Sequence, residues 1–204
     1  MNLRIGDASA AERNKRPIFD ALVTWLADAR AVLEIGAGDA THARYARRRL
    51  PHVRWQTSEA PAHLRRLTAA LVDGARDPRL PAPLALDVRG AWPAACFDAV
   101  FAANVAHIMS ETAVAALFAG AGAHLNAHGL FCLYGPFFDA DETPGEGNLG
   151  FDRALRARDP AMGVRARQAL DALAADHGLV CAARLTMPSD NRLLIWRKAD
   201  SPRR

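Results

Sequence analysis

The chain has 204 residues, of which half are hydrophobic and 24% charged, and its formal net charge is +4 at pH 7. Its apolar runs are far shorter than the ~18 residues of a membrane span, and its N-terminal stretch lacks the apolar segment of a signal peptide, so we expect a cytoplasmic protein with no membrane partner. Nearly all the positive charge is arginine beside Asp and Glu, without interleaved aromatic residues, so we expect no nucleic-acid partner.

Strands and helices are predicted to alternate along the chain. The first expected strand, Ala31–Ile35, is apolar up to Glu34, as expected for a strand buried on both faces. The expected strands are Ala31–Ile35, Val53–Thr57, a third ending at Asp87, Ala99–Ala103, Gly129–Leu133, Gly178–Pro188 and Asn191–Lys198. The expected helices are Arg16–Asp28 (within an N-terminal helical segment, 1–30), Thr41–Leu50, Ala62–Asp73, Glu111–Leu125 and Val164–His177. This alternation predicts a single α/β domain over 1–204 with a doubly wound parallel sheet, whose ligand site lies beyond the carboxyl ends of its strands.

The alternation stops after Tyr134. The stretch "GPFFDADETPGEGNLGFD" is rich in Gly, Pro and acids and is too long for an ordinary connection. We therefore expect a lid or substrate insertion over 135–163, with loop Gly135–Gly150 closing over a substrate and Phe137 near it. The alternative is a mobile surface insertion.

A glycine-rich turn follows the first expected strand, in "AVLEIGAGDAT". A dinucleotide turn would meet a pyrophosphate, yet Glu34 stands just before the turn and Thr41 takes the place of the third glycine. A carboxylate there favours a ligand with positive charge and no phosphate, such as S-adenosylmethionine (SAM). Gly36 and Gly38 would let the backbone approach that ligand closely.

Two further acids end the next strands. Glu59 is placed to accept from both hydroxyls of a ribose, and Asp87, beside Val88, from an adenine amine. The alternative for each is a solvated or helix-capping acid.

With these residues in place, the chain resembles class I SAM-dependent methyltransferases, and within them the methyltransferase-like 26, or domain of unknown function 938, family. The segments that carry the resemblance are "AERNKRPI", "VLEIGAGDATHA", "WQTSE", "LDV", "FDAVFAANVAHI", "LYGPF", "FDRALRARDPAMGVR" and "MPSDNRLLIWRK". The resemblance implies a Rossmann-like, mostly parallel seven-stranded sheet with an antiparallel last strand, and SAM as cofactor with S-adenosylhomocysteine (SAH) as product. The chain departs from the family pattern at Glu59, usually Asp; at Arg167, usually an acid; and at Asp190–Asn191, usually Asn-Asn.

Methyl transfer chiefly requires alignment and exclusion of water. A base is needed only if the acceptor must lose a proton, and His107 is the candidate; the alternative is a structural histidine. Tyr134 would line the acceptor pocket or lie in the core. Asn104 would contact the methionine part of the cofactor or orient the acceptor. Asn14 and Lys15 would fold over the carboxylate of the cofactor.

The expected function is therefore methyl transfer to a small-molecule acceptor, anionic or aromatic. Arg156 and Arg165 would bind an anionic acceptor, unless they form a solvated helix face, and Asn191 would lie in the same substrate region. The alternative function is a non-catalytic module that binds SAM or a protein partner; a nucleotide-dependent oxidoreductase is opposed by Glu34 and Thr41.

No metal site is expected, since the histidines lack metal-ligand spacing. The three cysteines (Cys96, Cys132, Cys181) are an odd number in apolar segments, which predicts reduced core thiols. The sequence leaves the oligomeric state open.

Overall fold

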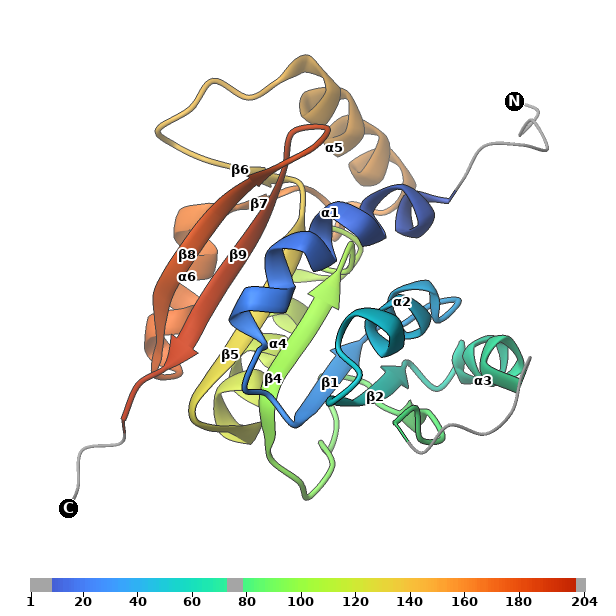
Figure 1. The fold of residues 1–204 in the computed structure, drawn as a ribbon. Coiled ribbons are helices and arrows are strands. Elements are labelled where there is room, and N and C mark those ends of the chain that lie inside the picture. Colours follow the sequence, from blue (N-terminus) through green and yellow to red (C-terminus); the bar gives the residue numbers. More distant parts are fainter. Residues whose placement is uncertain (1–8, 73–78, 201–204) are drawn as a thin grey trace.

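A seven-stranded sheet forms the centre of the molecule (Figure 1). This computed structural model describes residues 9–72 and 79–200. The strands of the sheet are β1 (Ala31–Ile35), β2 (Arg54–Glu59), β3 (Leu84–Ala85), β4 (Phe97–Ala103), β5 (Leu125–Gly135), β8 (Leu179–Met187) and β9 (Asn191–Lys198). Their order is β3-β2-β1-β4-β5-β9-β8. The first five are mutually parallel, and β9 runs antiparallel to both β5 and β8, so the expected sheet with an antiparallel last strand is confirmed.

Helices cover both faces of this sheet. They are α1 (Ala10–Trp25), α2 (Thr41–Arg49), α3 (Leu64–Val72), α4 (Glu111–His124), α5 (Glu146–Arg158) and α6 (Arg167–Asp176). Apolar residues of α1, α2 and α3 pack on one face, and those of α4 and α6 pack on the other. In Figure 1 α1 crosses in front of the sheet, and α5 lies above the carboxyl ends of β4 and β5.

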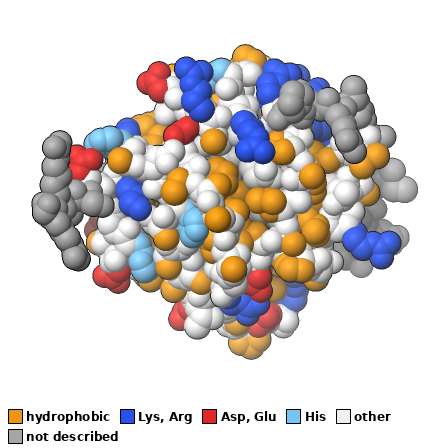
Figure 2. All heavy atoms as spheres, turned by 90° about the horizontal axis from the view of Figure 1, so that it is seen from below, with side chains coloured by type: hydrophobic (Ala, Val, Ile, Leu, Met, Phe, Trp, Pro, Cys, Tyr) orange, Lys and Arg blue, Asp and Glu red, His pale blue; other side chains and the backbone are white. Residues whose placement is uncertain are grey.

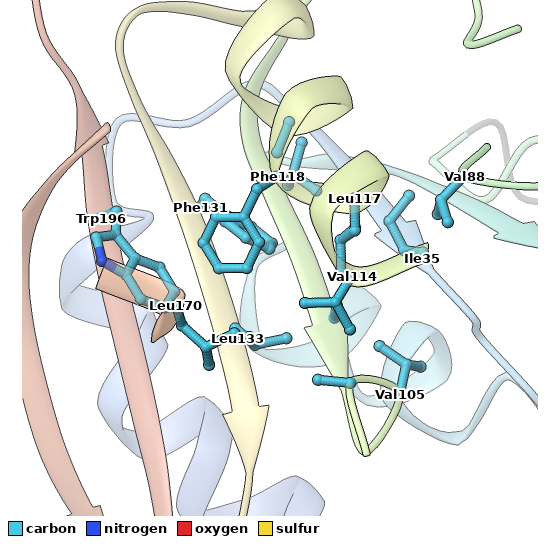
Figure 3. Packing of buried hydrophobic residues seen from close by; sticks show 14 of the residues in the cluster. Ile35, Val88, Val105, Val114, Leu117, Phe118, Phe131, Leu133, Leu170 and Trp196 are labelled. Atoms are coloured by element: carbon cyan, nitrogen blue, oxygen red, sulfur yellow. The ribbon is translucent and has the colours of Figure 1, made fainter. Parts of the chain in front are cut away.

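The core on the α4 and α6 face is centred on three aromatic rings (Figure 3). Phe118 meets Phe131 and Trp196 edge-on, with ring centroids 5.0 and 5.2 Å apart, and Phe131 and Trp196 stack at 5.6 Å. Each such pair stabilises the fold by about 0.5–1.5 kcal/mol beyond its buried area. The middle of β5 is therefore packed firmly against α4 and β9.

Helix α1 begins six residues earlier than its predicted start at Arg16. Ser9 caps the helix by accepting from the backbone N–H of Glu12 at 3.2 Å. Pro17 lies inside the helix, where it removes one backbone hydrogen bond. The earlier start matters because it places Asn14 on a buried face of the helix.

The expected irregular loop after Tyr134 contains regular structure, which corrects the prediction. Two-residue strands β6 (Phe137–Phe138) and β7 (Arg165–Ala166) pair in parallel, and α5 follows the exposed segment 139–145. The predicted helix Val164–His177 accordingly starts only at Arg167. Phe137 is buried in the core.

The cysteines differ from the prediction of three core thiols. All are free, but only Cys132 is buried, and Cys96 and Cys181 are exposed. Burial raises the pKa of the Cys132 thiol to about 12, so this thiol is unreactive at neutral pH.

Figure 2 shows the face at the amino ends of the parallel strands, where apolar side chains gather near the centre and most charges lie toward the rim. A cavity of about 470 Å³ at this end is lined by residues such as Trp25, Leu130 and Arg197, and by none of the predicted site residues. None of the described helices is long and apolar enough to cross a membrane.

Candidate functional site

The glycine turn joins β1 to α2 and is built from left-handed backbone. Gly36 and Gly38 have φ of +68° and +59°, and Ala40 at the helix start has φ of +61°. A Cβ at Gly36 would lie 2.6 Å from Cγ1 of Val105, so packing alone requires glycine there. A Cβ at Gly38 would meet nothing within 4 Å. Gly38 therefore faces open space in which a ligand could lie against the backbone.

Glu59 ends β2 directly beside this turn. Its carboxylate accepts from the N–H of Gly38 at 2.9 Å and from the N–H of Ala60 at 2.9 Å. Its backbone carbonyl accepts from Leu86 N–H at 2.9 Å, which brings the end of β3 alongside. The predicted ribose acid and the glycine turn thus meet in the structure.

Asp87 lies just past β3 and forms a local ion pair. It accepts from the Arg89 guanidinium at 2.8 and 3.0 Å and from Arg89 N–H at 3.0 Å. These hydrogen bonds lower the pKa of Asp87 to about 2, so its carboxyl group is charged at neutral pH. Both side chains are largely solvent-exposed, at 41% and 62%, so the pair is weak and exchangeable. Val88, next to it, is buried.

Glu34 is enclosed beneath the helices that cover β1. Its Oε2 accepts from Nε1 of Trp55 at 2.6 Å, and its Oε1 lies 3.7 Å from Nδ1 of His42. Burial raises the pKa of Glu34 to about 8, against the lowering effect of the Trp55 hydrogen bond, so the carboxyl group is mainly neutral at pH 7. The sequence predicts that Glu34 offers a negative charge to a cationic ligand; that contact stays a prediction.

A polar chain runs from Glu34 toward the end of β5. The ring of His42 lies 2.8 Å, Nε2 to Oδ1, from buried Asn14, and Asn14 is hydrogen-bonded to the Tyr134 side chain. Burial lowers the pKa of His42 to about 4, so the imidazole is neutral. His42 was considered in the sequence only as a metal ligand. The hydrogen bond between His42 and Asn14 was not predicted, because it depends on the early start of α1.

A cavity of about 360 Å³ opens at the carboxyl ends of β4 and β5. Residues from α1, α5 and the β8–β9 turn complete its walls, and these elements converge there in Figure 1. It gathers five predicted site residues, namely Asn14, Asn104, His107, Tyr134 and Asn191. Lining residues that were not predicted include Arg13, Asn148, Phe151 and Ser189.

His107 and Asn104 follow β4 on a tight turn. Asn104 has φ of +59° and donates its backbone N–H to the Tyr134 carbonyl at 2.9 Å, which fixes the two strand ends together. His107 is 7% exposed, and its ring meets Phe151 edge-on with centroids 5.0 Å apart. Burial, and then the Arg165 charge, lower the pKa of His107 to about 4. The imidazole is therefore a neutral hydrogen-bonding group at neutral pH.

Several predicted residues lie elsewhere. The Arg165 guanidinium donates to the backbone carbonyls of Ala106, Met109 and Ala161, the first at 3.2 Å and the last at 2.7 Å. Arg156 donates to Asp152 at 2.9 Å. Both arginines line a separate cavity of about 750 Å³ beside α4 and α6.

Lys15 and Phe137 also do not line the cavity at β4 and β5. Lys15 pairs with Glu12 one helical turn away. Phe137 is part of the core beneath the cavity. Whether either residue contacts a ligand stays a prediction.

Arginines hold the first part of segment 139–145, from Asp139 to Glu142. Arg167 donates to Asp139 at 2.5 and 2.9 Å and to Asp141 at 3.0 Å. Arg192 donates to Glu142 at 2.5 Å. The segment expected to be a lid is therefore tied to α6 and β9.

Among residues 9–72 and 79–200, no group of three His, Cys, Asp or Glu side chains is placed to hold a metal ion. The expectation that the protein uses no metal stays a prediction.

The family and fold of the chain follow from comparison with known proteins. The family model described as "Protein of unknown function (DUF938)" matches residues 6–198. An O-methyltransferase family protein from Burkholderia thailandensis is similar in structure, with a TM-score of 0.77 at 15% identity over 94% of this chain and 57% of that one. Human N-acetylserotonin methyltransferase in complex with SAM gives a TM-score of 0.76 at 14% identity, over 92% of this chain and 52% of that one. PigF with SAH gives a TM-score of 0.77 at 16% identity, over 91% and 56%. The chain thus has the fold of these methyltransferases and spans little more than half of their length.

Proposed function

This chain belongs to the DUF938 family of proteins of unknown function, and from its site we propose that it is a SAM-dependent methyltransferase acting on a small-molecule acceptor. The observation that carries the proposal is the meeting of the open Gly38 backbone and the Glu59 carboxylate, with 2.9 Å between Gly38 N and Glu59 Oε2, at the same edge of the sheet as Asp87 and the cavity at the ends of β4 and β5. The SAM and SAH complexes among proteins of similar fold support the same reading.

The residues present fit this cofactor. Gly38 leaves room for a ligand against the backbone, since a Cβ there would touch nothing. Glu59 would exchange its backbone partners for the two hydroxyls of a ribose, and Asp87 would exchange Arg89 for an adenine amine. Such bonds to charged acceptors are worth about 1.5–3 kcal/mol each. Bound there, SAM supplies a methyl group activated by its sulfonium.

The cavity at the ends of β4 and β5 would hold the acceptor. Tyr134 lines this cavity, and its hydroxyl group can donate to a ligand or accept from one. His107 is neutral and can receive a proton from the acceptor, although its low pKa makes it a weak base. The walls from α5 and the β8–β9 turn would exclude water during transfer.

Calorimetry with SAM and SAH tests the proposal. We expect micromolar dissociation constants, about −8 kcal/mol. Glu59→Gln should weaken SAH binding about tenfold, because a neutral amide accepts more weakly from a diol. Glu111→Gln is the matched control, since this acid is 89% exposed and lies beside the other cavity. Binding of a nicotinamide dinucleotide in place of SAM and SAH would overturn the assignment.

A further inference from the structure

The cavity at β4 and β5 is polar but nearly uncharged. No Asp or Glu is among its described lining residues, and His107 is neutral near pH 7. Arg13 is the one charged lining residue in the described part of the chain; its side chain is exposed and already has a partner. An anionic ligand would therefore enter without an available cation deep in the cavity, which is costly.

Two carboxamides in the walls have fixed orientations. The amide nitrogen of Asn148 donates to the carbonyl of Asp190 at 3.0 Å and to its carboxylate at 2.9 Å. The amide nitrogen of Asn191 donates to the carbonyls of Pro188 and Ser189 at 3.0 and 3.2 Å. All four partners only accept, so turning either amide over would set oxygen against oxygen.

The amide oxygens of Asn148 and Asn191 are consequently left as acceptors. Within the described residues no group donates to either oxygen. Asn148 is 9% exposed and lines the cavity, and its amide oxygen is not among the described buried atoms that lack a partner, so it stays accessible for a ligand to donate to in place of solvent. Complementarity requires a ligand that brings hydroxyl or N–H donors to this wall.

The aromatic part of the cavity points to a ring. Phe151 is 39% exposed on α5 and lines the cavity beside His107. The volume of about 360 Å³ is at the small end of sites for small molecules. Prolines 17, 136 and 188 supply further rigid apolar walls.

We propose that this cavity takes an uncharged aromatic acceptor whose hydroxyl or N–H groups donate to Asn148 and Asn191. The proposal rests on the proposed function only in naming the bound molecule as methyl acceptor. It separates two options that the sequence left open, since the two arginines predicted to bind an anion have their guanidinium groups engaged with carbonyls and with Asp152 at another cavity.

Three benzenes with the same 1,3-substitution pattern test the preference for an uncharged donor ligand by ligand-observed NMR titration, with and without SAH. Resorcinol carries two donors, 1,3-dimethoxybenzene carries none, and isophthalate is an anion with the same substitution pattern. We expect resorcinol to bind about tenfold or more tightly than either of the other two, because only it satisfies the amide oxygens.

Substitutions in the cavity wall test whether its residues cause the preference for resorcinol. Asn191→Leu should weaken resorcinol about fivefold or more and leave 1,3-dimethoxybenzene unchanged. Asn126→Leu is the matched control, because Asn126 donates to Asp98 at the opposite end of the sheet. Phe151→Ala, on an exposed helix face, should weaken all three probes without loss of fold.

The results separate the two proposals. Equal binding of resorcinol and 1,3-dimethoxybenzene, tighter binding of isophthalate, or no binding of any probe overturns the inference while SAH binding sustains the proposed function. Resorcinol preference in a protein that fails to bind SAM or SAH overturns the proposed function and leaves the preference of the cavity standing.

Discussion

The buried Glu34 carboxyl predicts a specific pH dependence of stability. Its pKa is raised to about 8 in the fold, from an ordinary value of 4.5. Between these values the unfolded chain has released a proton that the folded chain keeps, so the free energy of unfolding must fall as pH rises, and the fall ends near pH 8. Glu34→Gln keeps an oxygen to accept from Trp55 but cannot ionise, so the variant should not show this fall.

The magnitude follows from the window in which Glu34 acts alone. His42 and His107 have pKa values lowered to about 4 from 6.5, so they make stability rise with pH, but only up to about pH 6.5. From pH 6.5 to 8 the remaining effect is that of Glu34, about 1.4 kcal/mol for each pH unit. We therefore expect a loss of about 2 kcal/mol over this range in the natural protein.

Equilibrium urea unfolding at both pH values, with reductant present to protect the free cysteines, measures the difference. Glu111→Gln, at an exposed acid, serves as the control and should keep the full fall. A natural protein whose stability is flat from pH 6.5 to 8, or a Glu34→Gln variant that retains the fall, would refute the assignment of a neutral Glu34.

Three shorter predictions concern the site itself. Gly38→Val should weaken SAH binding at least about tenfold by calorimetry, because it fills the open space against the turn and strains a φ of +59°; unchanged affinity would remove Gly38 from the site. His107→Gln should lower turnover while leaving SAH affinity unchanged, and the natural rate should not fall between pH 8 and 6, because the pKa of His107 is about 4. Arg167→Leu should speed hydrogen exchange in segment 139–145, because its ion pairs hold Asp139 and Asp141; unchanged exchange would mean that other contacts hold it.

The sheet was predictable because its strands have clear ends in the sequence. Ala31–Ile35 and Asn191–Lys198 match their predicted bounds, each being an apolar run beside turn or charged residues. The predicted start of α1 was wrong because it rested on the apolar spacing that begins at Ile18, whereas Ser9 supplies the cap further upstream. Strands β6 and β7 were missed because two residues have no periodicity and their partners are far apart in sequence.

The location of the candidate site could be predicted from the sequence better than the contacts of its side chains. Parallel strands end at one edge, so acids after β2 and β3 had to approach the glycine turn, as Glu59 does. The sequence could not predict which face of the sheet the Glu34 side chain lies on. A strand buried on both faces has no alternation of polar and apolar residues that would assign its side chains to one layer or the other. Asn148 was missed because it lies in the predicted loop Gly135–Gly150, whereas the structure begins α5 at Glu146.

The positions where the chain departs from its family pattern are mostly in the frame of the cavity and not in its lining. Arg167 ties segment 139–145 to α6 through Asp139 and Asp171. The Asp190 carboxylate accepts hydrogen bonds from the Arg192 guanidinium and from the amide nitrogen of Asn148. The bond to Asn148 fixes the β8–β9 turn against α5. A change at such a position would alter the wall by moving the side chains that it holds, so the acceptor preference that we propose would depend on ion pairs outside the cavity as well as on the residues that would touch the acceptor.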